Sequence, residues 1–135
     1  MSGALDGIRV LDLTSVVMGP MATQILGDLG ADVITVESAT GDTNRAMGHG
    51  PHRYLSGVSL NLLRSKRNVA VDLKQPEGRD IILRLAATSD VFVTNLRPGP
   101  LSRLQLSYED VAAVRPDIVY CQAQGFPTDS ERADD

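Results

Sequence analysis

Three cationic residues lie within four positions of the sequence, at Arg64, Lys66 and Arg67, beside a segment that alternates like a β-strand. An arginine presents a planar fork to phosphate oxygens and a lysine presents a compact charge, so this spacing suits a phosphate-bearing ligand. Arg97 and Arg103 follow another expected strand and could converge with the first three on one ligand with several phosphates. A solvated turn is the alternative explanation of such a charge run.

Residues 15–20 occupy the place where a dinucleotide-binding fold carries its glycine-rich phosphate loop. Gly19 is the only glycine there, so the GxGxxG fingerprint is absent. Glu37 ends the next expected strand, where a ribose-binding carboxylate would lie, although a lone acidic residue at a strand end is more often solvated. The missing fingerprint argues against an NAD site, and an NAD-binding half-domain is the alternative.

The sequence shows no motif for a nucleophilic catalytic centre or for a metal site. No Ser/His/Asp or Cys/His arrangement can be assembled, so the catalytic residues are unknown at this stage. His49 and His52 lack the cysteine or carboxylate spacing of a zinc site, and no metal is expected. Cys121, the single cysteine, lies in an apolar segment where we expect a small core residue, and it excludes an internal disulfide.

Strands and helices alternate along the chain, and these elements must position the candidate residues. Apolar runs predict strands at 8–13, 31–37, 68–73, 91–95 and 118–123. Helices are expected at 21–29, from 76 onward, briefly at 101–104, and from a capping box at Ser107 and Asp110 to just before Pro116. Residues 58–63 fit a helix or a strand, and 38–56 predict a long loop. The βαβ pattern predicts an α/β fold, a parallel sheet with flanking helices.

The composition fits one soluble domain. The chain has 135 residues, 42% of them hydrophobic and 22% charged, with a net charge of -4. Without a basic stripe a nucleic acid partner is not expected, and without a long apolar run neither is a membrane. The single cysteine and the lack of a signal peptide favour the cytoplasm. A polar segment follows the last expected strand where a covering helix would come, so we expect an incomplete domain without its carboxyl-terminal portion.

The chain resembles the class III CoA-transferase family through most of its length. This family includes formyl-CoA and carnitinyl-CoA transferases and the α-methylacyl-CoA racemases. The segments that carry the resemblance are 5–13, 19–24, 29–37, 65–74, 76–79, 90–99, 116–121 and 125–126.

The resemblance implies that residues 1–135 form the amino-terminal part of a Rossmann-like large domain that binds coenzyme A. It also implies an interlocked homodimer that takes an acyl-CoA and a carboxylic acid acceptor. Carried over by position, the CoA contacts fall into four groups: Val17 and Met18 at the adenine; Leu62, Leu63, Arg64 and Ser65 along the nucleotide and pantetheine, with Lys66 close by; Asn95, Leu96, Arg97 and Arg103 at the phosphates; Gln124, Gly125 and Phe126 near the thioester.

Two departures from the family pattern matter. Ser38 stands where several members have an arginine, so one nucleotide contact is in doubt. The transferases' aspartate nucleophile, which forms a covalent intermediate, lies beyond the Gly-Phe segment and outside these residues. The resemblance therefore implies the CoA-binding part of a transferase that moves CoA between carboxylic acids. An acyl-CoA racemase and a truncated, non-catalytic CoA-binding module are the alternatives.

Overall fold

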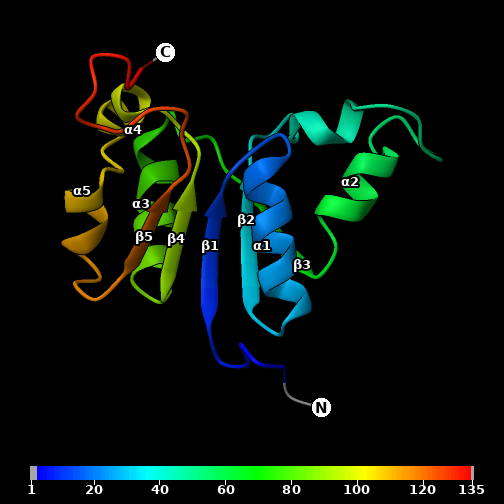
Figure 1. Ribbon diagram of the computed structural model, residues 1–135, viewed down its shortest axis with the longest axis horizontal. Helices are drawn as coiled ribbons and strands as arrows, with labels where there is room; N and C mark the ends of the chain where they lie inside the picture. The colour runs from blue at the N-terminus through cyan, green and yellow to red at the C-terminus, as the bar shows by residue number, and fades with distance from the viewer. Residues whose placement is uncertain (1–2, 135) are drawn as a thin grey trace.

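A parallel β-sheet forms the centre of the protein in the computed structural model, which describes residues 3–134. Within that range five strands lie in the order β3-β2-β1-β4-β5, and every neighbouring pair is parallel. The strands are β1 (Arg9–Leu13), β2 (Asp32–Glu37), β3 (Lys66–Ala70), β4 (Val91–Thr94) and β5 (Val119–Gln122), and Figure 1 shows them pointing the same way. The predicted α/β fold with a parallel sheet and flanking helices is confirmed.

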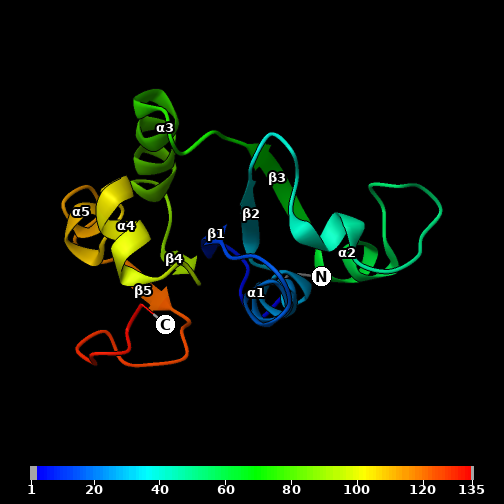
Figure 2. The same cartoon turned by 90° about the horizontal axis from the view of Figure 1, so that it is seen from above.

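Helices cover both faces of this sheet. They are α1 (Met18–Asp28), α2 (Gly57–Leu62), α3 (Pro76–Ala86), α4 (Pro98–Leu104) and α5 (Tyr108–Ala112), with a 3-10 helix η1 (Thr43–Ala46) before α2. Figure 2 shows α1 on one side of the sheet and α3 on the other, with α4 and α5 near β5 and α2 beyond β3. Each connection between strands brings the chain back to the end of the sheet where the strands begin, as a parallel sheet requires.

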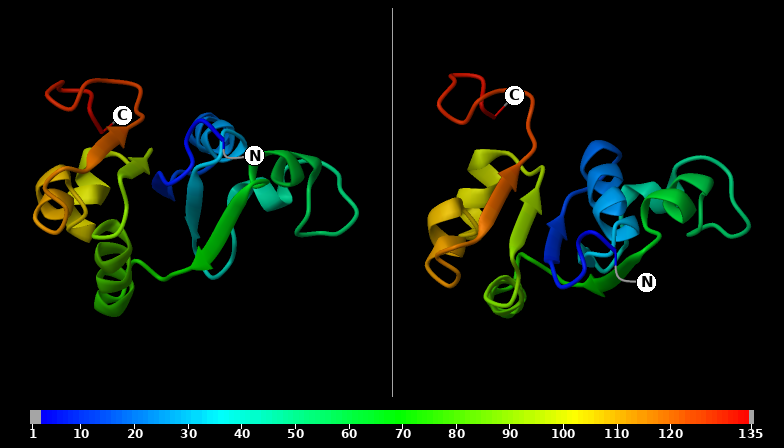
Figure 3. Two further views of the ribbon diagram at one scale, coloured as in Figure 1. Left: turned by 90° about the horizontal axis from the view of Figure 1, so that it is seen from below. Right: turned by 60° about the horizontal axis from the view of Figure 1, so that its bottom comes forward.

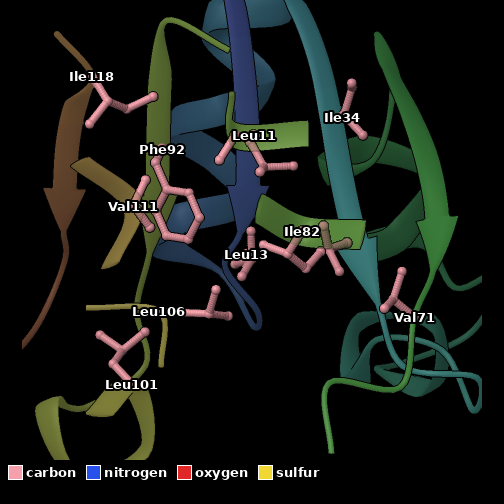
Figure 4. Close-up of a cluster of buried hydrophobic side chains, with 12 residues drawn as sticks. Leu11, Leu13, Ile34, Val71, Ile82, Phe92, Leu101, Leu106, Val111 and Ile118 are labelled. Carbon is pink, nitrogen blue, oxygen red and sulfur yellow. The ribbon is translucent and has the colours of Figure 1, made fainter. Parts of the chain in front are cut away.

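The larger hydrophobic core lies between the sheet and α3, α4 and α5. Leu11 and Phe92 are fully buried on neighbouring strands, and Ile82 of α3 packs against them (Figure 4). The Phe92 ring stacks on Tyr120, with ring centroids 5.1 Å apart. A smaller cluster under α1 contains Val10, Ala31, Val33 and Val93. Strands buried on both faces read as continuous apolar runs, which is why the sequence predicted them.

Some element boundaries differ from the expectation. Helix α1 begins at Met18 rather than residue 21, with Pro20 in its first turn, where a backbone N–H has no partner within the helix. Strand β3 begins at Lys66 rather than residue 68, and residues 57–62 are helical. The Ser107–Asp110 capping box is confirmed.

The expectation for Cys121 is wrong. Its side chain is exposed, because Cys121 and Val119 share the face of β5 opposite to the large core, and Val119 is also exposed. Helix α1 covers this face of the sheet, and it packs over β1, β2 and β4. An apolar run shows that a strand exists, but not whether both of its faces are covered.

Candidate functional site

The strand order reverses direction between β1 and β4. From β1 the chain builds outward through β2 and β3, and it then crosses back to place β4 and β5 on the other side of β1. Open α/β sheets bind ligands outside the carboxyl ends of their strands at such a switch point. A cavity of about 340 Å³ lies at the carboxyl ends here, lined among others by Thr14, Ser15, Asp42, Leu73 and Leu96.

The loop that leaves β1 is fixed by side chains from the sheet. Asn95, directly after β4, accepts a hydrogen bond from the Ser15 backbone N–H at 3.1 Å and donates one to the Ser15 carbonyl oxygen at 3.0 Å. One step earlier, Asp12 accepts from the backbone N–H of Thr14 at 3.0 Å. These contacts join the carboxyl ends of β1 and β4 across the switch point.

Val16, which follows Ser15, has a strained backbone. Its φ of +68° lies in the left-handed region, which is unfavourable for a β-branched side chain and costs about 1–3 kcal/mol. Val16 and Val17 are more than 40% exposed and Met18 is 62% exposed. The loop therefore displays three apolar side chains at the switch point. Nothing in the sequence predicts a positive φ at Val16, because valine rarely adopts one.

Lys66 reaches into the protein from the first position of β3. Its ammonium donates hydrogen bonds to Asp12 Oδ2 at 3.1 Å, the Pro20 carbonyl oxygen at 2.9 Å and Thr23 Oγ1 at 2.7 Å. An ammonium has three protons to donate, so these acceptors use its full capacity. The Lys66 side chain is 1% exposed and that of Asp12 is fully buried. Burial lowers the pKa of Lys66 from its ordinary value, and the charge of Asp12 opposes this effect.

Glu37 is buried and paired, so the expectation of a solvated carboxylate is wrong. Arg45 donates to its two oxygens from Nε at 2.7 Å and from Nη2 at 2.6 Å, and the Asp42 backbone N–H donates at 2.9 Å. Burial raises the pKa of Glu37, but these hydrogen bonds outweigh it and hold the pKa below its ordinary value. Glu37 therefore holds η1 against the end of β2.

The sequence comparison decides the family. A family model described as CoA-transferase family III matches residues 5–135. The chain belongs to this family. It is 46% identical over 123 residues to succinyl-CoA:glutarate CoA-transferase of Mus musculus, an alignment that covers 90% of this chain and 28% of that protein. It is 40% identical over 132 residues to formyl-CoA:oxalate CoA-transferase of Streptomyces avermitilis, covering 93% of this chain and 31% of that protein.

Solved structures agree with this assignment to CoA-transferase family III. A CAIB/BAIF family protein from Brucella suis superposes with a TM-score of 0.91 at 35% identity, over 98% of this chain and 36% of that one. The chain thus spans about a third of the length of the relatives it matches. A short chain dehydrogenase/reductase family protein reaches a TM-score of 0.52 at 19% identity, a likeness of fold alone. The family match favours CoA-transferase family III over an NAD-binding half-domain.

One group of the predicted CoA contacts lies at the end of α2 and the start of β3. Leu63, Arg64 and Arg67 line a cavity of about 300 Å³ between α2 and β3, whereas Leu62, the last residue of α2, is buried. Arg64 pairs with Asp28 at 2.8 Å, and Ser65 donates to the same carboxylate at 2.7 Å.

A second group of predicted contacts lies around α4 and after β5. Arg97 precedes α4 and donates to the Asp134 carbonyl oxygen at 2.7 Å, and Arg103 lies within α4. Residues 124–126 follow β5, where the Arg132 guanidinium lies 4.0 Å from the centroid of the Phe126 ring. Helices α2 and α4 lie at opposite ends of the molecule (Figure 1), as do the 38–56 loop and the carboxyl-terminal segment (Figure 3). The two groups of cations therefore do not converge on one point, and only an extended ligand could contact both.

No helix within residues 3–134 is long and apolar enough to cross a membrane.

Proposed function

We propose that this chain forms the CoA-binding part of a CoA-transferase that moves CoA from an acyl-CoA to a carboxylic acid. The observation that carries the proposal is a fixed apolar loop at the switch point of a chain whose relatives are CoA-transferases. In this proposal residues 1–135 are the amino-terminal part of a Rossmann-like large domain, and the protein acts as a homodimer.

The polarity of the candidate site fits the chemistry of CoA. The faces of the adenine ring are flat and apolar, and the exposed side chains of Val17 and Met18 would offer a matching surface beside the cavity at the carboxyl ends. The phosphates would be held by Arg97 and Arg103, and Arg64 would lie along the nucleotide and pantetheine, since these arginines retain exposure to solvent. An extended molecule such as CoA can span groups that lie this far apart.

The other proposed contacts follow the same path. Leu62, Leu63 and Ser65 would lie along the nucleotide and pantetheine, with Leu62 at the buried end of α2. Asn95 and Leu96 would lie beside the nucleotide at the end of β4, and Lys66 would support the site from within. Gln124, Gly125 and Phe126 would lie near the thioester, where the acyl group reacts.

The chemistry in this proposal is covalent catalysis by a carboxylate. An aspartate in the part of the relatives beyond the matched region attacks the acyl-CoA thioester and forms a mixed anhydride, with release of the CoA thiolate. The thiolate then attacks the aspartyl carbonyl of the anhydride, which releases the donor carboxylate and leaves CoA as a thioester on the aspartate. The acceptor carboxylate attacks this thioester to form a second anhydride, and the released CoA thiolate takes the acceptor acyl group and restores the aspartate. The part played by residues 3–134 is to bind CoA and hold it while its thiolate leaves and returns.

A transfer assay tests the proposal on the protein purified from the organism that produces it. Succinyl-CoA and glutarate are supplied together, because the Mus musculus relative is named for this pair, and the acyl-CoA products are separated by chromatography. The expected result is glutaryl-CoA with an equal amount of succinate. Arg97→Gln should weaken CoA binding, while Arg84→Gln on α3 serves as the matched control. Hydrolysis of succinyl-CoA without transfer to any of several carboxylic acids would contradict the proposal.

A further inference from the structure

Glu37 occupies a position that binds ribose in dinucleotide-binding α/β folds. It ends β2, the strand beside β1, and in those folds a carboxylate near this position accepts hydrogen bonds from the ribose hydroxyl groups. The cavity at the carboxyl ends extends from Leu96, beside the switch point, to Glu37 and Ser38. A ribose bound in this cavity would therefore face the end of β2.

In this chain Glu37 has no acceptor left for a ribose hydroxyl group. An ionised carboxylate offers about four lone-pair sites, and hydrogen bonds from the protein use all of them. Arg45 donates to both oxygens, the Asp42 backbone N–H donates to Oε2, and the Asn68 side-chain amide donates to Oε1. The Glu37 side chain is only 3% exposed. An unphosphorylated ribose thus finds no free carboxylate where an NAD-binding fold supplies one.

The turn between β2 and η1 keeps Arg45 on Glu37. The Gly41 backbone N–H donates to the Ser38 carbonyl oxygen at 2.9 Å and closes this turn. Gly41 has a φ of +86°, and a Cβ at this position would lie 2.9 Å from Arg45 Cδ. Because Gly41 has no side chain, the stem of Arg45 can lie against the turn while its guanidinium pairs with the carboxylate.

The guanidinium also compensates a negative charge in the cavity wall. Asp42 and Asp72 line the same cavity, and so does Lys74. An unpaired Glu37 carboxylate would add another negative charge to this wall and would repel a phosphate group bound there. The pair of Glu37 and Arg45 has no net charge, so the wall accepts a phosphate on the ribose. CoA carries such a phosphate on the 3′ oxygen of its ribose, and NAD carries none.

We propose that the pair of Glu37 and Arg45 is a specificity determinant that selects a 3′-phosphorylated ribose over an unphosphorylated one. Arg45 occupies the carboxylate that would otherwise bind ribose hydroxyl groups, and it cancels the charge that would repel the phosphate. This inference rests on the proposed function, in which CoA binds at the carboxyl ends of the strands.

Dephospho-CoA, which lacks only the 3′-phosphate, isolates this effect. Calorimetry measures the dissociation constants of CoA and dephospho-CoA for the wild type, Arg45→Met, Glu37→Gln and the double variant, each expressed in the organism that produces the protein. The wild type should bind CoA more tightly than dephospho-CoA.

The two single variants should shift the ratio of these dissociation constants in opposite directions. Arg45→Met uncovers the Glu37 charge, so CoA binding should weaken about fivefold relative to dephospho-CoA. Glu37→Gln leaves the guanidinium without its counter-charge, so CoA binding should strengthen about threefold relative to dephospho-CoA. The double variant removes both charges and should return the ratio to within about twofold of the wild type.

A purely structural role gives a different result. If the pair only held η1 against β2, each single variant would weaken both ligands by the same factor, and the ratio would keep its wild-type value. That result, or equal affinities of the wild type for the two ligands, would overturn the inference and leave the proposed function intact. A wild-type protein that binds neither ligand would overturn both.

Arg115→Met is the matched control. Arg115 pairs with Asp90 at 3.1 Å at the amino ends of the strands, just before β4 begins. Breaking this pair also removes an arginine from a carboxylate, but at the end of the sheet opposite to the cavity, so the ratio should not change. A shift as large as that of Arg45→Met would overturn the inference. If Arg45→Met does not fold, a Glu37→Gln ratio equal to that of the wild type would overturn it.

Discussion

The ammonium of Lys66 lies 3.1 Å from Asp12 Oδ2, in a buried pair that joins β3 to β1 beneath α1. Asp12 also accepts a hydrogen bond from Thr23 of α1 at 2.6 Å. The pair therefore connects two non-adjacent strands and a helix at one point. The lysine that the sequence placed among the phosphate-binding cations makes its hydrogen bonds inside the protein.

Removing Lys66 should destabilise the fold. Lys66→Met leaves the Asp12 carboxylate buried without its partner, a loss of about 3–5 kcal/mol. Urea denaturation followed by circular dichroism measures the free energy of unfolding. Arg67→Met is the matched control, because its ion pair with Asp32 is exposed and such pairs contribute at most about 1 kcal/mol. Unchanged stability in Lys66→Met, with reduced CoA affinity alone, would show that the ammonium faces the ligand instead.

Glu37 should make the fold sensitive to acid. Its pKa in the folded protein lies below the ordinary 4.5, so its contribution to stability is fully present above that value and is lost as the pH falls toward the folded pKa. The difference in unfolding free energy between wild type and Glu37→Gln should therefore shrink as the pH falls below 4.5. A difference that stays constant down to strongly acidic pH would contradict this assignment.

Gly19→Ala should destabilise the protein by about 1–3 kcal/mol, because the added methyl group overlaps the buried Thr14 side chain. Thermal unfolding gives the comparison with Gly57→Ala. At Gly57 the nearest contact of a Cβ is an ordinary 3.5 Å, and alanine favours the helix by up to about 1 kcal/mol. Equal effects at the two positions would mean that the loop does not pack on the start of α1 as described.

The sheet could be predicted from the sequence because its strands are short apolar runs separated by helices. Val10, Leu11, Val33 and Phe92 are inside whichever face they point to, so the pattern alone identifies their strands. The capping box at Ser107 is local for the same reason, since its two partners lie three residues apart.

The parts that could not be predicted depend on partners distant in the sequence. Lys66 reads as a surface charge until β3 is placed two strands from Asp12, and Glu37 reads as solvated until Arg45 folds back onto it. The exposure of Cys121 depends on what covers one face of an edge strand. The positive φ of Val16 follows Ser15, whose hydrogen-bond partner Asn95 is 80 residues away.

The decisive measurement is a calorimetric titration of the purified protein with CoA, repeated in the presence of NADH. We expect saturable binding of CoA that NADH does not displace. Tight binding of NADH, with no competition from CoA, would contradict the assignment of this switch point as a CoA site.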